Sequence, residues 1–279
     1  MNKGVALIGC GTIGKEIAFA IDSGRIKNAS IVTLFDKVKS AAYELRSKLH
    51  HNDPHIFSDF TEFISSRSFE GTDIVVEAAS QDAVNKFCKK IVENGKSLMI
   101  MSVGALADQI LLSELLDKAS HNQCHIYVPT GAIAGIDAIR SVRHMIDSVM
   151  LSTTKSPKAL SDAPFFNMAG FDPSKLNQKT VIYEGSAADA VKKFPSNVNV
   201  AAVLGLAGVG IENTMVKIIV DPNTDRNQHE ITVNGKFGEM TISVRNIPSP
   251  TNPKTSFLAV LSAIECLRSV CDDIIRIGT

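Results

Sequence analysis

The sequence predicts an α/β protein with a doubly wound parallel sheet, followed by a second, α+β domain whose sheet is largely antiparallel. Three observations support this prediction. A glycine-rich loop begins at Gly9, between an apolar run and a helical pattern. Strand and helix patterns then alternate over about 130 residues, which is typical of parallel βαβ units. Beyond that region strand patterns follow one another directly, as in an antiparallel sheet.

The glycine-rich loop has the spacing G-x-G-x-x-G, with Gly9, Gly11 and Gly14 at the fixed positions. The apolar residues 5–8 predict a buried strand before it, and residues 15–21 have helical spacing after it. In a Rossmann-type fold such glycines allow a tight turn, the approach of a pyrophosphate and close packing of a helix whose N-terminus attracts phosphate. We therefore expect dinucleotide binding. The cofactor-contacting residues expected in this loop are Gly9, Gly11, Thr12, Ile13 and Gly14.

The second strand pattern, residues 30–35, ends in Asp36. An acidic residue about 20 positions beyond the glycines is the expected partner of the adenosine ribose hydroxyls. Its charge would repel the 2′-phosphate of NADP, so Asp36 favours NAD as the cofactor. Lys37 and Lys39 lie close by in the sequence and leave NADP use open.

The third clear strand pattern covers residues 74–80 and includes Ala78 and Ala79 near its end. Small residues there let a flat cofactor lie against the backbone, at the edge where open α/β sheets bind ligands. We therefore add both alanines to the expected cofactor site. Other patterns in this half predict strands at 56–58, 96–102 and 125–129, and helices at 41–49, 82–93, 109–120 and 136–144.

The second half has a different order of patterns. The pair Asn234-Gly235 lies between strand patterns at 229–233 and 236–244 and is a strong hairpin signal. Residues 162–180 are rich in Pro, Asn and Gly and are expected to be irregular. The other elements expected in this half are strands at 148–154, 181–186 and 214–220, and helices at 187–193 and 196–206.

A last helix is expected over residues 254–270, with Asn252 as its N-cap and Pro253 at its start. Its apolar stripe needs a surface to pack on, and we expect it to return to the first domain. The predicted organisation is therefore a dinucleotide-binding domain at 1–147, a substrate domain at 148–250 and a returning segment at 251–279.

Composition argues against several classes of protein. The 29 Lys and Arg balance the 29 Asp and Glu, which argues against a nucleic-acid or anionic-membrane partner. No apolar run approaches the roughly 20 residues that span a bilayer, and the first strand begins too early for a signal peptide. The five cysteines are scattered without a C-x-x-C pair, so we expect reduced thiols and a cytoplasmic location.

Three histidines and an aspartate lie within residues 50–55, a composition that invites a metal-site interpretation. The break Asn52-Asp53-Pro54 and the lack of other clustered ligands favour a polar loop instead. We expect no metal.

Four later motifs carry a resemblance to a known family. They are G-A-I-A-G-I-D-A at 131–138, N-V-N-V-A-A at 197–202, D-P at 221–222 with N-Q-H-E-I at 227–231, and P-T-N-P-K-T-S at 250–256. In this order, and with the glycine loop, they make the chain resemble the L-aspartate dehydrogenases, NAD(P)-dependent enzymes that can feed NAD biosynthesis. The resemblance covers nearly the whole chain.

The resemblance implies reversible oxidative deamination of L-aspartate to iminoaspartate, then oxaloacetate and ammonia. It also implies that His229 is the active-site residue. An alanine of the G-A-I-A-G loop, Ala132 or Ala134, and Asn199 would contact the nicotinamide end. By analogy we expect a homodimer formed through the open sheet of the second domain.

The residues themselves are compatible with this chemistry. Histidine exchanges protons near neutral pH, and His229 is the only histidine of the second half. A plainer interpretation is that it sits on a sheet, because Ile231 and Val233 share its face at period two. A dicarboxylate substrate also needs cations or N–H donors. The candidates are Lys155, Arg226, Arg245, Lys254 and the expected helix start at Asn252 and Thr255.

Two alternatives stay open. One is another NAD(P)-dependent reductase of amino-acid metabolism, resembling homoserine dehydrogenase or dihydrodipicolinate reductase, although their lysine-centred signatures are not found. The other is a non-catalytic NAD(H)-binding sensor. A sensor would keep the glycine loop and dispense with His229 and the anion-binding residues, so their joint presence counts against it.

Overall fold

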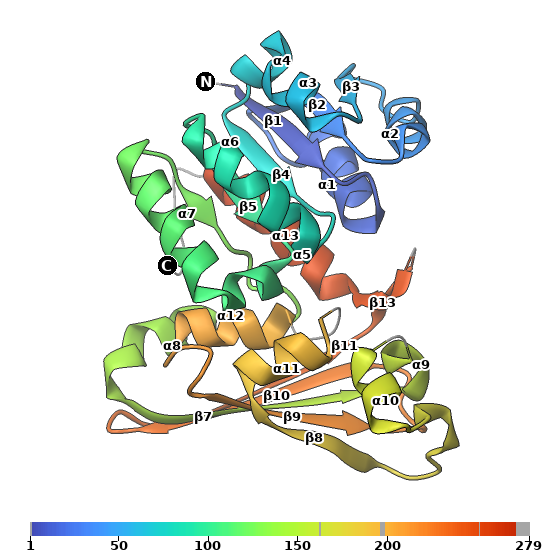
Figure 1. Cartoon of the computed structure of the whole chain (residues 1–279), viewed down its shortest axis with the longest axis vertical. Helices are drawn as coiled ribbons and strands as arrows, with labels where there is room; N and C mark the ends of the chain where they lie inside the picture. Colours follow the sequence, from blue (N-terminus) through green and yellow to red (C-terminus); the bar gives the residue numbers. More distant parts are fainter. Residues whose placement is uncertain (1, 162, 196–198, 251, 272–279) are drawn as a thin grey trace. The chain divides into compact units, whose positions relative to one another are not determined.

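The computed structural model describes the chain except residues 1, 162, 196–198, 251 and 272–279 (Figure 1). The described residues form two compact units. Unit 1 is built from the described residues of 2–129 and 260–271, and unit 2 from the described residues of 130–259. The border after Pro129 lies earlier than the predicted border at 147, so the small-residue loop at 130–135 groups with the second sheet.

Unit 1 contains a parallel sheet with the strand order β3-β2-β1-β4-β5-β6 among the described residues. Its central strands β1 and β4 are buried on both faces, as expected for a sheet with helices on both sides. The strand order reverses between β1 and β4, which is where open α/β sheets bind ligands. The predicted Rossmann-type fold is confirmed. The strands are β1 (Lys3–Ile8), β2 (Ala29–Phe35), β3 (His55–Phe57), β4 (Ile74–Glu77), β5 (Ser97–Ile100) and β6 (Ile126–Tyr127).

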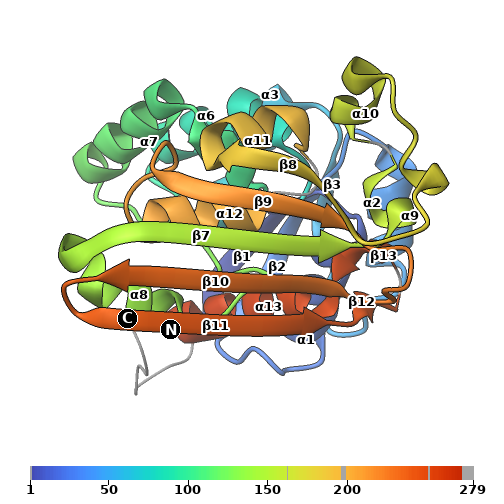
Figure 2. The ribbon, with the colours of Figure 1, turned by 90° about the horizontal axis from the view of Figure 1, so that it is seen from below.

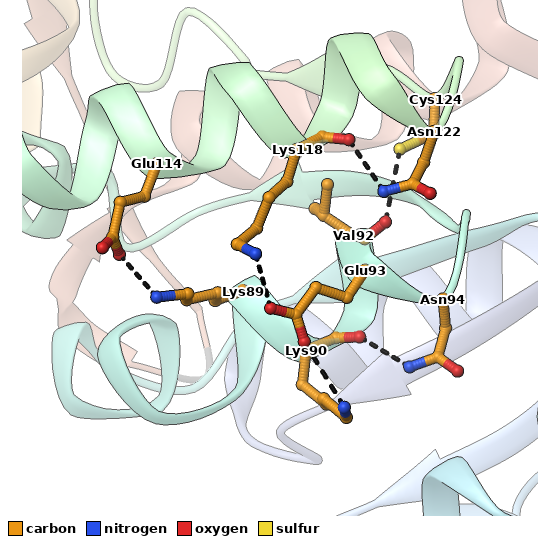
Figure 3. A network of polar contacts seen from close by, with 9 residues as sticks. All are labelled: Lys89, Lys90, Val92, Glu93, Asn94, Glu114, Lys118, Asn122 and Cys124. Carbon is orange, nitrogen blue, oxygen red and sulfur yellow. Dashed lines mark hydrogen bonds and ion pairs between the residues drawn. The ribbon is translucent and has the colours of Figure 1, made fainter.

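The helices of unit 1 follow the predicted alternation with the strands. They are α1 (Thr12–Asp22), α2 (Lys39–Arg46), α3 (Phe60–Ile64), α4 (Arg67–Glu70), α5 (Gln81–Ala83), α6 (Lys89–Glu93), α7 (Gln109–His121) and, from Val260 on, α13 (Phe257–Cys271). A π-helical turn, Val84–Cys88, joins α5 to α6, so the helix predicted at 82–93 is continuous but not uniform. Ion pairs tie α6 to α7, with Lys118 Nζ 2.6 Å from Glu93 and Lys89 Nζ 2.9 Å from Glu114 (Figure 3).

Unit 2 contains a mixed sheet with the strand order β11-β10-β7-β9-β8 among the described residues. Its pairs are antiparallel except β7 with β9, which is parallel. The predicted, largely antiparallel sheet is therefore confirmed, with one parallel pair that the pattern did not indicate. The strands are β7 (Ile146–Lys155), β8 (Thr180–Ser186), β9 (Thr214–Val220), β10 (Asn227–Gly235) and β11 (Gly238–Asn246).

Helices α8 (Ile136–Val142), α11 (Ala187–Lys193) and α12 (Asn199–Ala207) lie on one face of this sheet, and Figure 2 shows the opposite face. The residues that face the helices along β10, such as Ile231 and Val233, are fully buried. Among the described helices of the chain, none combines the length and apolar character of a membrane-spanning segment.

The hairpin of β10 and β11 is present, but its predicted turn is wrong. Gly235 still pairs with Gly238, so the turn residues are Lys236 and Phe237. Gly235 is needed for a different reason, because a Cβ there would clash with the carbonyl oxygen of Met145, the residue just before β7. The pairing register of β10 with β7 shifts at this point, and Lys236 N–H donates to Met145 O at 2.8 Å.

The predicted start of the last helix is also wrong. Residues Asn252–Ser256 form strand β13, which pairs with β12 (Pro248–Ser249), and the helix begins at Phe257. The chain stays extended because Asn227 Nδ2 donates to Ser256 Oγ at 3.2 Å and Phe257 N–H donates to Ile247 O at 3.0 Å. The expected anion site at a helix N-terminus therefore does not exist at 252–255.

The segment expected to be irregular at 162–180 contains a helix, α10 (Pro164–Ala169), after the short α9 (Pro157–Leu160). Aromatic packing orders it, since the Phe165 and Phe194 rings are stacked with centroids 4.9 Å apart and Phe166 also lies against Phe194. Local composition could not reveal this, because Phe194 lies about 30 residues further along the chain, beyond the roughly 18-residue windows in which such patterns are read.

Candidate active site

The glycine loop of unit 1 is shaped by close packing. Gly9 has a φ of +98°, and a Cβ there would lie 2.7 Å from the Ala78 carbonyl oxygen. At Gly14 a Cβ would clash with the Gly9 carbonyl oxygen, so α1 packs directly on the loop. A Cβ at Gly11, by contrast, would meet no atom of the described residues within 4 Å. The loop thus leaves open space at the N-terminus of α1, which fits the expected pyrophosphate.

Asp36 joins the end of β2 to the glycine loop. Its Oδ2 accepts the Cys10 N–H at 2.8 Å, and its Oδ1 accepts the Val38 N–H at 2.8 Å. A carboxylate has about four acceptor positions, so both oxygens keep capacity for the two ribose hydroxyls. The ribose contact itself stays a prediction.

Glu77 is a buried residue of this sheet edge that the sequence analysis did not single out. It ends β4 and is 0% exposed. Its carboxylate accepts the N–H groups of Ala79 and Ser80 at 2.8 and 2.9 Å, and both the N–H and hydroxyl of Ser102 at 3.0 and 2.9 Å. Burial raises the pKa of this carboxyl group. Glu77 therefore holds together the loops that follow β4 and β5, including Ala78 and Ala79.

The histidine-rich loop after α2 is organised around a carboxylate. Asp22 accepts the N–H groups of His50 and His51 at 2.7 and 2.8 Å, and the side-chain amide of Asn52 at 2.9 Å. Among the described residues, no three His, Cys, Asp or Glu side chains are grouped as ligands of a metal ion.

Buried polar side chains gather at one end of the sheet of unit 2, where β7 and β11 end and β10 begins. Six of the thirteen buried polar or charged residues described for the chain lie in this polar cluster. Its members are Thr153, Lys155, Asn227, His229, Asn246 and Ser256. Burying so many polar groups is costly unless they have partners, so the polar cluster is a candidate site.

His229 occupies the centre of the polar cluster. It is 3% exposed and pairs across the sheet with Thr153 of β7. The Nδ1 atom of His229 lies 3.1 Å from Thr153 Oγ1. Burial and the charge of Lys155 lower the pKa of His229 to about 3, so its imidazole is neutral at physiological pH.

Lys155 is the last residue of β7 and is 5% exposed. It lies two positions beyond Thr153 and hence on the same face of the sheet. Burial lowers its pKa to about 8. The ammonium group is therefore mostly charged near neutral pH, and the structure brings this predicted substrate residue next to His229.

The loop predicted to contact nicotinamide belongs to the same unit as His229. Asn246, at the end of β11, donates its Nδ2–H to the Ala132 carbonyl oxygen at 2.8 Å. Ala132 is buried, Ala134 is exposed, and Asn199 is the first residue of α12. Unit 2 thus carries His229, Lys155 and the expected nicotinamide contacts, while unit 1 carries the glycine loop and Asp36.

Other predicted substrate residues lie elsewhere. Arg226 is exposed and lies 3.6 Å from the carboxylate of its neighbour Asp225. Arg245 pairs with Gln228 and points to the sheet face opposite His229. Thr255 lies half-buried in β13. The side chains of Asn252 and Lys254 lie outside the described residues, so their roles stay predictions.

Known proteins match this arrangement along the whole chain. A family model described as "Aspartate dehydrogenase, C-terminal" matches residues 137–270, and one described as "Homoserine dehydrogenase, NAD binding domain" matches residues 9–129. The L-aspartate dehydrogenase of Nitrosopumilus maritimus is 46% identical over 277 residues, 99% of this chain and 100% of the relative. The chain belongs to the aspartate dehydrogenase family. A second relative in this family, from Methanosarcina mazei, is 45% identical over 99% of both chains.

The solved structures agree with membership of the aspartate dehydrogenase family. The crystal structure of aspartate dehydrogenase from Thermotoga maritima has 27% sequence identity and a TM-score of 0.75, with both chains covered completely. A hyperthermophilic archaeal homoserine dehydrogenase in complex with NADPH has a TM-score of 0.58 but only 12% identity, so it shows a shared fold alone. The NAD-binding domain match supports NAD or NADP as the cofactor of this family member.

Proposed function

We propose that this chain catalyses the reversible NAD(P)-dependent oxidation of L-aspartate to iminoaspartate, which water converts to oxaloacetate and ammonia. The observation that carries this proposal is the pair of His229 and Lys155, buried in one polar cluster of a chain that belongs to the aspartate dehydrogenase family. A buried cation suits a dicarboxylate, and a buried histidine suits proton transfer. Bound NAD(P) would supply the hydride acceptor.

The residues of unit 1 are assigned to the cofactor. Gly9, Gly11 and Gly14, with Thr12 and Ile13, form the loop and helix start that would hold the pyrophosphate. Ala78 and Ala79 would border the cofactor at the end of β4, where Glu77 anchors the loop. Asp36 would bind the adenosine ribose, and its charge favours NAD over NADP.

The residues of unit 2 are assigned to the reaction. In the neutral imidazole of His229 one nitrogen carries hydrogen and the other accepts. When Nδ1–H donates to Thr153 Oγ1, Nε2 keeps its lone pair and can take a proton from the substrate ammonium or from attacking water. Lys155 would pair with a substrate carboxylate, and Ala132 or Ala134 with Asn199 would contact the nicotinamide.

One assay tests the proposal. Purified protein is mixed with NAD or NADP and L-aspartate, and reduced cofactor is followed by absorbance, with L-glutamate, L-alanine and L-homoserine as comparison substrates. We expect turnover with L-aspartate and little with the others. Turnover with L-homoserine instead would favour the alternative reductase. Binding of NADH without turnover of any substrate would favour the sensor.

Three wider expectations belong to the same proposal. The reaction would serve NAD biosynthesis, the protein would act in the cytoplasm, and two copies would associate through the sheet face shown in Figure 2. Val181 and Met215, which are large apolar side chains on β8 and β9, are exposed in the single chain and support the last expectation. Light scattering of the purified protein measures the oligomeric state.

A further inference from the structure

Lys155 and His229 are close enough to influence each other through charge. Thr153 pairs with His229 across β7 and β10, and Lys155 follows Thr153 on the same face of β7. Both residues are almost completely buried, so water screens their interaction poorly. A proton taken up by His229 would therefore be placed beside an existing positive charge.

No other charged side chain among the described residues of the neighbouring elements contributes to the pKa shift of His229. Burial and Lys155 are the causes of its shifted pKa. The helix-facing residues of β9 and β11 and the residues of α12 are not ionisable, and Arg245 lies on the opposite sheet face. On α11, the carboxylate of Asp189 instead accepts hydrogen bonds from Lys193 Nζ and the Tyr183 hydroxyl. Two charged residues of α8, Asp137 and Arg140, are exposed.

We propose that Lys155 couples substrate binding to the protonation of His229. Its ammonium group keeps the imidazole unprotonated in the free protein, and a substrate carboxylate that pairs with Lys155 cancels this effect. The inference rests on the proposed function and adds to it. It makes His229 an effective base only when a carboxylate occupies the site.

The oxidation requires the substrate ammonium to lose a proton, and the coupling would allow His229 to accept it. The substrate arrives as an ammonium ion, and one N–H bond must break before the Cα–H hydride leaves. The proton passes to Nε2 of His229, which becomes an imidazolium beside Lys155. Without a carboxylate the site would hold two buried positive charges, which is strongly unfavourable. With the carboxylate of the substrate in place, the three charges sum to a single positive charge.

The first test uses the unmodified protein and succinate, an unreactive dicarboxylate. Nitrogen NMR of the histidine-labelled chain, with His229 assigned from a His229→Gln spectrum, follows its protonation from neutral to mildly acidic pH. We expect the ring to stay neutral over this range without succinate, because its pKa is then about 3, and to take up a proton at the acidic end of the range at saturating succinate, which corresponds to an upward shift of about two pH units or more. A titration that succinate does not move overturns the proposal.

The second test removes the charge. Lys155→Met keeps the length of the side chain without the ammonium, Lys155→Arg keeps the charge, and Lys217→Met is the matched control. Lys217 lies on the neighbouring β9, half-buried, 3.3 Å from Glu184. In Lys155→Met we expect His229 to titrate about one unit higher without any ligand, and the KM for aspartate to rise at least about tenfold.

The remaining variants show whether the charge of Lys155 causes the shifted titration of His229. Lys155→Arg keeps the charge, so its His229 should titrate like that of the unmodified protein. Lys217→Met should leave both the titration of His229 and the KM for aspartate unchanged. A Lys155→Met protein whose His229 titrates like the unmodified protein overturns the proposal. Failure of the proposed function is a separate result, namely no aspartate-dependent reduction of NAD or NADP by the unmodified protein. The succinate titration can still be interpreted in that case.

Discussion

Replacing Asn246 by alanine tests whether the end of β11 positions the loop predicted to contact nicotinamide. The buried Asn246 amide donates to the Ala132 carbonyl oxygen at 2.8 Å. Removing it leaves a buried acceptor unpaired, at a cost of about 1–3 kcal/mol. The loop of the free variant can avoid this cost by moving to another conformation in which the acceptor is hydrated. Only the remaining fraction of molecules then has the loop in the position that binds NADH. NADH affinity should then fall by about 5- to 150-fold.

Two measurements separate the possible outcomes for Asn246. NADH fluorescence gives the affinity, and urea denaturation gives the free energy of unfolding. Asn246→Asp keeps the shape but replaces the donor by an acceptor, so it should lose at least as much affinity. Asn234→Ala, at an exposed asparagine of the adjacent β10, is the control and should change neither quantity. An Asn246→Ala protein that binds NADH like the unmodified chain refutes the reasoning, whether or not its stability falls.

Three further predictions follow from single residues. Thr33 of β2 has the one described buried hydroxyl that lacks a hydrogen-bond partner, so Thr33→Val should raise the free energy of unfolding in urea by about 1 kcal/mol; a loss of stability would contradict this. Asp36→Ala should raise the turnover ratio of NADP to NAD, whereas an unchanged ratio would show that Asp36 is not at the ribose. His229→Ala should bind NADH normally but lose about 100-fold or more in kcat, and full turnover would disprove its catalytic role.

The sequence by itself determined most of unit 1. Strands β1 and β4 are almost completely buried on both faces and β2 is largely buried, so each is a mostly apolar stretch that can be recognised locally. The glycine loop is equally local, because its spacing reflects contacts between residues close in the chain and the end of β4. The sequence also determined the mixed order of elements in unit 2 and, through a resemblance, the family. The roles of Asp36 and His229 stay predictions.

The tertiary structure decided what depends on residues far apart in the chain. The turn of the β10–β11 hairpin moved to Lys236 and Phe237 because Gly235 packs against the start of β7. The segment at 252–256 is a strand because β12 and Asn227 hold it extended.

Contacts between residues far apart in the chain also distinguish Lys155 from the other predicted cations. Lysine and arginine are usually exposed, and nothing in the sequence distinguishes Lys155 from Arg226 or Arg245. Only the pairing of β7 with β10 buries Lys155 on the face that carries His229. Burial removes the water that would screen its charge, so the tertiary structure turns an ordinary lysine into one that acts on His229.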